Sequence, residues 1–184
     1  MMKTVGLLRH AKSSWAQPGL SDFDRPLAPR GRTAAALVGG EMNRRGLAFD
    51  LVLASPARRV VETLQQVEKG YGAGLPTRFD PEIYTASACR LLAMLRRTEV
   101  GVRSVLLVGH NPALQELALL LTSEQDPLRE EIDEKYPTAG LALLHSVAGQ
   151  WRELWPEGAT LDAFLLPKKL RRDIPGPASS PSGD

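Results

Sequence analysis

The residues best suited to chemistry follow three short apolar runs of this chain. Arg9 and His10 come directly after the first run, Arg59 lies shortly after the second, and His110 lies just beyond the third. Because ligands of parallel sheets bind beyond the carboxyl ends of the strands, we expect these four side chains to share one rim. Arginine binds phosphate oxygens through paired hydrogen bonds, and a neutral imidazole nitrogen can attack phosphorus. Fixed positive charge would stabilise the transition state. The pattern predicts a phosphoryl-transfer site.

The elements that must position these residues can be predicted from hydrophobic spacing. Short apolar runs typical of buried parallel strands cover residues 5–8, 51–54 and 104–108, with a further short strand at 77–79. Amphipathic spacing predicts helices at about 28–45, 56–70, 86–97 and 112–121. We expect Ser55 to be the N-cap of the second helix, because Pro56 follows it. Alternating strands and helices predict an α/β fold, a three-layer α/β/α sandwich with a largely parallel central sheet.

The last third of the chain has a different pattern. Residues 139–147, 151–155 and 161–166 are predicted as three more strands, the first two joined as a hairpin through Gly149. The acidic segment 124–134 is predicted as a solvated loop or helix surface without a function. We interpret 1–167 as the folded domain and 168–184 as a tail, first basic and then rich in Pro, Gly and Ser, that is disordered.

Composition and charge limit the classes of function. The 184 residues carry a formal net charge of only +2, which argues against general nucleic-acid binding. No apolar run approaches the ~20 residues of a membrane helix, so we expect a cytoplasmic protein without membrane contact. The single cysteine, Cys89, excludes an internal disulfide, and we expect it to be a packed core thiol.

Metal and cofactor sites are not predicted. The three histidines, of which His145 is expected to be an ordinary exposed strand residue, lack metal-ligand spacing. Neither a Walker loop nor a G-x-G-x-x-G motif is present. We therefore expect phosphoryl chemistry that uses no metal and no cofactor.

Four motifs follow one another along the chain: Leu8-Arg9-His10-Ala11-Lys12, Arg25-Pro26-Leu27 with Gly31, Ser55-Pro56 with Arg59, Glu62 and Thr63, and Gly109-His110-Asn111-Pro112. Together they resemble the histidine phosphatase superfamily, which also includes phosphoglycerate mutases and histidine acid phosphatases. The short length, the Arg-Pro-Leu element and the Gly-His-Asn-Pro element most resemble the small bacterial phosphohistidine phosphatases of the SixA type. The resemblance extends over about residues 3–166 and implies a phosphoglycerate mutase-like fold.

The resemblance also implies a role for each matching residue. His10 would be the phosphorylated nucleophile, Arg9 and Arg59 phosphate ligands, and His110 a ligand that stabilises the charged transition state. The family's spacing places the second arginine four residues after Ser55, which selects Arg59. The neighbouring Arg58 lies ~100° away around the helix and is expected to face solvent.

Two residues have alternative interpretations. Arg25 either binds phosphate or pairs with Asp22 or Asp24. Many relatives have a later Glu or Asp that protonates the leaving oxygen, and Glu82 is the nearest candidate here. Its surroundings do not match the mutase pattern, so we interpret Glu82 as a structural or rim residue rather than the general acid.

The resemblance predicts a phosphatase that works through a phosphohistidine enzyme intermediate. The first expectation is that it removes phosphate from phosphohistidine in a protein partner. The alternative substrate is a small phosphate monoester, such as a sugar phosphate. A phosphate-binding module without turnover is the third interpretation.

Overall fold

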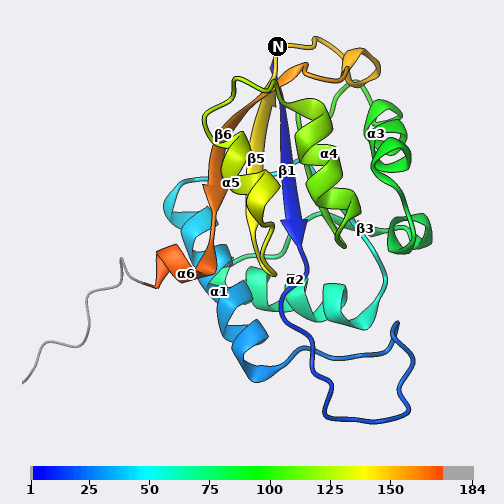
Figure 1. Cartoon of the computed structure of the whole chain (residues 1–184), viewed down its shortest axis with the longest axis vertical. Coiled ribbons are helices and arrows are strands. Elements are labelled where there is room, and N and C mark those ends of the chain that lie inside the picture. The colour runs from blue at the N-terminus through cyan, green and yellow to red at the C-terminus, as the bar shows by residue number, and fades with distance from the viewer. Residues whose placement is uncertain (1, 172–184) are drawn as a thin grey trace, which may run out of the picture.

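The computed structural model describes residues 2–171, in which six strands form a single sheet (Figure 1). The strand order is β3-β2-β4-β1-β5-β6. β1 pairs in parallel with β4, and β2 pairs in parallel with β3 and β4. β5 is antiparallel to both of its neighbours, β1 and β6. The predicted largely parallel sheet is therefore confirmed. The strands are β1 (Lys3–Arg9), β2 (Leu51–Ala54), β3 (Thr77–Phe79), β4 (Ser104–Gly109), β5 (Leu141–Ser146) and β6 (Ala159–Leu165).

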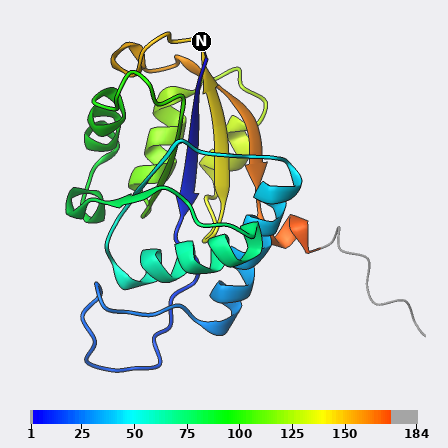
Figure 2. The ribbon, with the colours of Figure 1, turned by 180° about the vertical axis from the view of Figure 1, so that it is seen from behind.

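Helices cover both faces of this sheet. The helices are α1 (Pro29–Arg44), α2 (Arg58–Tyr71), α3 (Ala88–Arg96), α4 (Ala113–Leu121), α5 (Arg129–Glu134) and α6 (Pro167–Leu170), with short 3-10 turns η1 (Pro81–Tyr84) and η2 (Trp151–Glu153). α3, α4 and α5 pack on the face seen in Figure 1, and α1 and α2 cover the face seen from behind in Figure 2. The fold is the predicted three-layer sandwich.

Alternation along β1 shows how the strands serve two cores. Val5 and Leu7 belong to the core under α3 and α4, whereas Leu8 belongs to the core under α1 and α2. Successive side chains of a strand point to opposite faces, so a strand buried on both sides must be apolar throughout. This requirement explains why the apolar runs predicted these strands well.

α1 and α2 approach each other closely, which fixes the helix that carries Arg59. A Cβ atom on Gly39 would lie 2.0 Å from the carbonyl oxygen of Val67, and one on Gly70 would lie 2.0 Å from that of Ala36. Any side chain at either position would force the two helix backbones apart.

Two predictions about secondary structure are wrong. The second helix begins at Arg58 with Ala57 as its N-cap, so Ser55 is not the N-cap. The backbone N–H of Ser55 instead donates to the carbonyl oxygen of Val108 and continues the sheet by one residue. The predicted strand at 151–155 is the 3-10 turn η2, in which Trp151 is buried and donates its indole N–H to Val102. Its apolar residues serve core packing rather than strand pairing.

Cys89 is also placed differently from the prediction. It is exposed on α3, whose buried residues are Ala88, Leu91, Leu92 and Leu95. These four positions recur every three to four residues and form one face, from which Cys89 points away.

The chain end is described only in part. Residues 168–170 of the predicted tail belong to α6, and Leu170 packs beside the core under α1. Residues 172–184, the rest of that predicted segment, lie outside the described residues. Within residues 2–171, no helix has the length and apolar character needed to cross a membrane.

Candidate active site

The carboxyl ends of β1, β2 and β4 bring the predicted residues together. Arg9 is paired with Gly109 across the β1–β4 ladder, and the backbone N–H of His10 donates to the Gly109 carbonyl. The imidazole ring centroids of His10 and His110 lie 5.2 Å apart. Arg59 reaches the same place from the first turn of α2, with its Nη2 3.2 Å from His110 Nδ1.

The buried ring of His10 is held by a single backbone contact. Its Nδ1 lies 2.8 Å from the carbonyl oxygen of Ala11, which can only accept, so Nδ1 carries the proton and donates. Nε2 is therefore the nitrogen with the free lone pair. Burial is the main cause that lowers the pKa of His10 to about 3, and the positive groups at Arg59 and Arg9 add to it. The ring is neutral at pH 7, as a nucleophile must be.

The tautomer of His110 follows from its two partners. Arg59 Nη2 can only donate, so His110 Nδ1 accepts, and Nε2–H donates to Ser55 Oγ at 2.9 Å. Burial first and then the charge of Arg59 lower the pKa of His110 to about 4. A dianion bound beside this ring would raise that pKa and favour the imidazolium. Ser55 thus positions His110 instead of starting a helix.

Arg59 and Arg58 have opposite environments. The side chain of Arg59 is only 7% exposed, and its Nη1 and Nη2 donate to the backbone oxygen and the carboxylate of Asp22, at 2.5 and 2.9 Å. The side chain of Arg58 is 50% exposed and pairs with Glu62. The predicted solvent-facing position of Arg58 is confirmed, and Arg59 points to the site.

Arg9 and Arg25, the other two arginines predicted at the site, each have a buried Nε without a hydrogen-bond partner within the described residues. Arg9 Nη1 donates to the Tyr136 carbonyl at 2.6 Å, whereas its buried Nε has no hydrogen-bond partner within the described residues. Arg25 forms an ion pair with Asp22 at 3.2 Å, donates to Ser13 and stacks on the ring of Trp15. The alternative interpretation of Arg25, pairing with Asp22, therefore matches the structure.

Asp22 and Tyr84 are site residues that sequence reasoning missed. Tyr84 donates its hydroxyl proton to Asp22 Oδ2 at 2.9 Å, and its ring lies edge-on to the His110 ring. Although desolvation opposes the change, the hydrogen bond from Tyr84 and the charges of Arg59 and Arg25 lower the pKa of Asp22. The spacing of Asp22 from Arg25 indicated only a local ion pair between the two. Nothing in the sequence around Tyr84 indicated that it contacts the site.

Two neighbouring residues of α2 hold the site's loops in place. Thr63 Oγ1 accepts the backbone N–H of Ala11 at 2.9 Å and donates to the carbonyl of Arg59 at 2.5 Å. Glu62 accepts the backbone N–H of Leu27 at 2.9 Å. The segment after His10 and the helix that carries Arg59 are therefore linked by hydrogen bonds on buried groups, which are costly to break.

Glu82 and His145 lie apart from this group of residues. Glu82 is on η1, its side chain is 52% exposed, and its carboxylate accepts two hydrogen bonds from Arg90. His145 pairs with Thr4 near the start of β1, at the opposite end of the strand from His10. Its imidazole Nδ1 lies 3.2 Å from Thr4 Oγ1.

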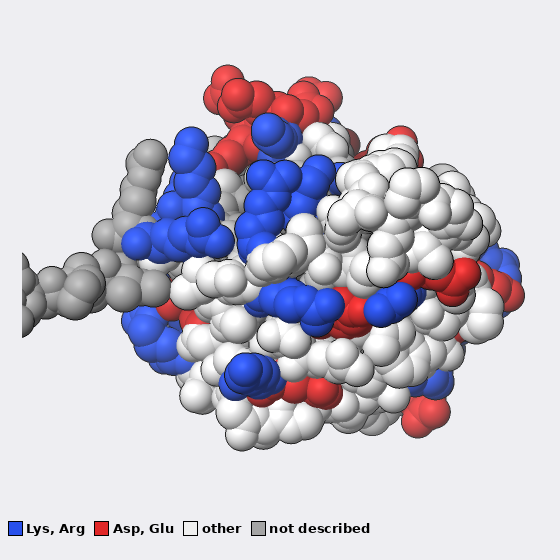
Figure 3. All heavy atoms as spheres, turned by 90° about the horizontal axis from the view of Figure 1, so that it is seen from below, with Lys and Arg blue, Asp and Glu red and all other residues white. Residues whose placement is uncertain are grey.

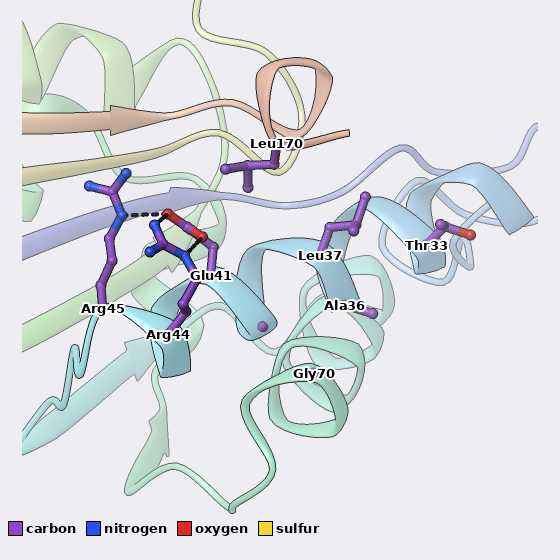
Figure 4. Close-up of a pocket in the computed structure, with 9 residues that line it drawn as sticks. Thr33, Ala36, Leu37, Glu41, Arg44, Arg45, Gly70 and Leu170 are labelled. Atoms are coloured by element: carbon purple, nitrogen blue, oxygen red, sulfur yellow. Dashed lines mark hydrogen bonds and ion pairs between the residues drawn. The ribbon is translucent and has the colours of Figure 1, made fainter. Parts of the chain in front are cut away.

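Within residues 2–171, neither a metal-ligand cluster nor the cavity beside α1 includes the predicted catalytic residues. Residues 2–171 contain no group of three or more His, Cys, Asp or Glu that could hold a metal ion. A cavity of about 690 Å³ lies between α1, α2 and α6, where Glu41 accepts hydrogen bonds from Arg44 and Arg45 (Figure 4). None of the four predicted catalytic residues lines it.

Comparisons with known proteins agree with the geometry. Residues 5–91 match the model of the histidine phosphatase superfamily, branch 1. The uncharacterized protein Rv1276c of Mycobacterium tuberculosis is 38% identical over 164 residues, which cover 88% of this chain and all of the relative.

Two solved structures described as candidate phosphohistidine phosphatases SixA are also similar. The one from Agrobacterium tumefaciens is 32% identical with a TM-score of 0.76, covering 89% of this chain and 97% of its own. The one from Nakamurella multipartitia is 27% identical with a TM-score of 0.77, covering 90% and 96%.

Proposed function

This chain belongs to the histidine phosphatase superfamily, and we propose that it is a phosphatase in which His10 is the transient phosphate carrier. The orientation of the His10 ring carries the proposal. Its Nδ1 proton is committed to Ala11, its lone pair is on Nε2, and its burial keeps the ring neutral. The guanidinium of Arg59 and the ring of His110 lie beside it.

The reaction would proceed in two displacements. First, His10 Nε2 forms a bond to phosphorus while the bond from phosphorus to the leaving group breaks, and the leaving group takes a proton from solvent. Water then attacks phosphorus, the Nε2–phosphorus bond breaks, and dihydrogen phosphate leaves with both water protons. His10 is neutral again at the end. This division into two steps is the usual benefit of a nucleophilic side chain.

The positive groups have distinct tasks in both steps. Arg9 and Arg59 would bind the equatorial phosphoryl oxygens, with the unsatisfied Nε of Arg9 as one further donor. His110 would stabilise the same charge, oriented by Ser55 on one side and Arg59 on the other. We propose that these groups replace a metal ion, so activity should persist in EDTA.

The leaving group favours phosphohistidine in a protein as the substrate. Imidazole leaves readily once it is protonated, whereas an alkoxide needs an enzymatic acid that is worth ~10²–10⁴-fold. Glu82 is bound to Arg90, and the lowered pKa of Asp22 makes that carboxyl a poor proton donor. A site without a suitable acid should hydrolyse phosphoramidates and aryl esters faster than sugar phosphates. The cytoplasmic location stays a prediction.

One experiment tests both the chemistry and the substrate class. Wild-type protein in EDTA is assayed with p-nitrophenyl phosphate, a phosphohistidine peptide and a panel of alkyl phosphates. Brief exposure to labelled substrate should place an acid-labile, base-stable phosphate on His10. We expect His10→Ala to lose turnover almost entirely, whereas the matched variant His145→Ala keeps it.

Three results would contradict the proposal. Retention of a tenth of wild-type activity by His10→Ala would exclude His10 as the nucleophile. Loss of activity in EDTA would refute metal independence. Fast turnover of alkyl phosphates with slow turnover of phosphohistidine would select the small-molecule phosphatase instead.

A further inference from the structure

A hollow lined by basic side chains lies next to the candidate active site. It encloses about 610 Å³ and is built from the segment after β1, the start of α1, the residues after α5, and α6. We call it the cationic hollow and define it by Lys12, Arg30, Lys135, Lys168 and Arg171. Figure 3 views the molecule from below, where β1 ends, and shows Lys and Arg side chains gathered on this face.

The described part of the chain provides no anionic partner for the cations of the hollow, unlike basic residues nearby. Within residues 2–171, none of the five side chains forms an ion pair. By contrast, Lys169 pairs with Glu131, and Arg32 pairs with Glu62. Like charges placed close together repel one another and raise the local positive potential. An arrangement of this kind is suited to an anionic partner.

Two of the segments that line the hollow are also close to Arg9 and His10. Lys12 lies two residues after His10. Pro137 and Thr138, which also line the hollow, follow Tyr136, whose carbonyl binds Arg9. The backbone N–H of Ala139 then donates to the carbonyls of Arg9 and His10. An anionic partner in the hollow would therefore lie beside the phosphoryl site.

The loop between β1 and α1 adds an exposed apolar surface. Trp15 is 73% exposed, Leu20 38% and Phe23 37%, and we call these three residues the apolar lip. The lip borders the site, because Phe23 packs against Tyr84 and the same loop brings Asp22 to Arg59. Exposed aromatic residues bordered by charge are typical of protein interfaces.

We propose that the cationic hollow and the apolar lip together form a docking surface for a protein whose phosphohistidine is surrounded by acidic residues. This inference rests on the proposed function and specifies the partner's chemistry. The hollow alone would suit any small polyanion. The lip favours a protein over a small polyanion as the partner. A polyphosphate gains nothing from exposed aromatic and aliphatic side chains, whereas a protein partner buries them.

Two peptides with one phosphohistidine each test the proposal. They have the same length, and one carries glutamates and the other serines on both sides of the phosphohistidine. The wild type should show a higher kcat/KM for the acidic peptide, and added salt should remove that preference. The double variant Lys135→Glu/Lys168→Glu should lower kcat/KM for the acidic peptide at least about tenfold. Its values for the serine peptide and for p-nitrophenyl phosphate should stay near wild type.

Arg152→Glu is the matched control, since Arg152 is an exposed residue of η2 that does not line the hollow. It should leave all three substrates unchanged. In the wild-type background, the single lip variant Leu20→Ala should lower turnover of both peptides but not of p-nitrophenyl phosphate. Equal turnover of the two peptides by the wild type would overturn the docking inference and leave the proposed function intact.

Two further outcomes separate the ideas. Unchanged peptide kinetics in the double variant, together with loss of tripolyphosphate binding, would assign the hollow to a small polyanion and overturn the inference. Hydrolysis of p-nitrophenyl phosphate with no turnover of either peptide would refute the proposed protein substrate, and the docking inference with it.

Discussion

Replacing Arg59 by lysine tests whether the site needs a guanidinium or only a positive charge. Arg59 uses Nη1 and Nη2 together, on the backbone oxygen and carboxylate of Asp22, and Nη2 also reaches His110. A lysine ammonium is a single point on a flexible stem and cannot provide these parallel donors. We therefore expect Arg59→Lys to fold normally and to lose most of its activity.

The size of the loss can be worked out from the contacts. Removing one preorganised transition-state donor costs about 10²–10³ in kcat. Arg59→Lys should therefore lose about 10²-fold or more, equivalent to ~3 kcal/mol of transition-state stabilisation. The loss should appear mainly in kcat, because the charge that attracts the substrate is retained.

Arg58→Ala is the matched comparison on the same helix turn. The half-exposed pair of Arg58 with Glu62 is worth about 0–1 kcal/mol, and Glu62 keeps its bonds to Leu27 and Arg32. The activity of Arg58→Ala should stay within about fivefold of wild type, the factor that corresponds to 1 kcal/mol. Steady-state kinetics with p-nitrophenyl phosphate and a thermal melt of each variant make the measurement. Equal losses at both positions, or an active Arg59→Lys, would refute the placement of Arg59 at the phosphoryl group.

Three other predictions concern the histidines and the proposed lack of an acid. Folding lowers the pKa of His10 to about 3 and of His110 to about 4, so below pH 6.5 the unfolded chain binds more protons than the native state. The free energy of unfolding should therefore fall as pH drops from 6.5 to about 5.5, above the range in which carboxylates contribute, as measured by urea titration at each pH. The two histidines would contribute no such fall if both rings titrated normally. Ser55→Ala removes the acceptor of the His110 Nε2 proton and should lower kcat by up to about tenfold, the cost of one lost hydrogen bond; an unchanged kcat would show that Ser55 does not position His110. Glu82→Gln should change phosphohistidine hydrolysis by only a few-fold, and collapse of that activity in a peptide assay would make Glu82 the general acid.

The inner strands could be predicted because β1, β2 and β4 are buried on both faces. Residues 51–54 and 77–79 form strands with the predicted bounds, and β1 extends only slightly beyond residues 5–8. An uninterrupted apolar run of four to eight residues is too short for a typical helix, so its length favours a buried strand. The rim position of Arg9 and His10 followed directly from the end of the run.

Errors arose where a side chain's partner is distant in sequence. Ser55-Pro56 has the composition of a helix start, yet the hydroxyl contacts His110, which is 55 residues away. Segment 151–155 has the composition of a strand, yet the indole N–H of Trp151 donates to the carbonyl oxygen of Val102. Local patterns register neither contact, because tertiary packing overrides propensity when a buried polar atom needs a partner.

Asp22 shows most clearly what only the fold could reveal. Its carboxylate accepts hydrogen bonds from Arg59 and Tyr84 and forms an ion pair with Arg25, so a single anion connects three groups around the phosphoryl site. Under the proposed function, a phosphoryl oxygen bound to Arg59 would compete with this carboxylate for the guanidinium N–H donors, and the two anions would repel each other. Binding of the phosphoryl group must therefore weaken the contact between Asp22 and Arg59. Because Asp22 belongs to the loop that carries the apolar lip, the proposed function predicts that phosphoryl binding and the position of that loop are energetically coupled.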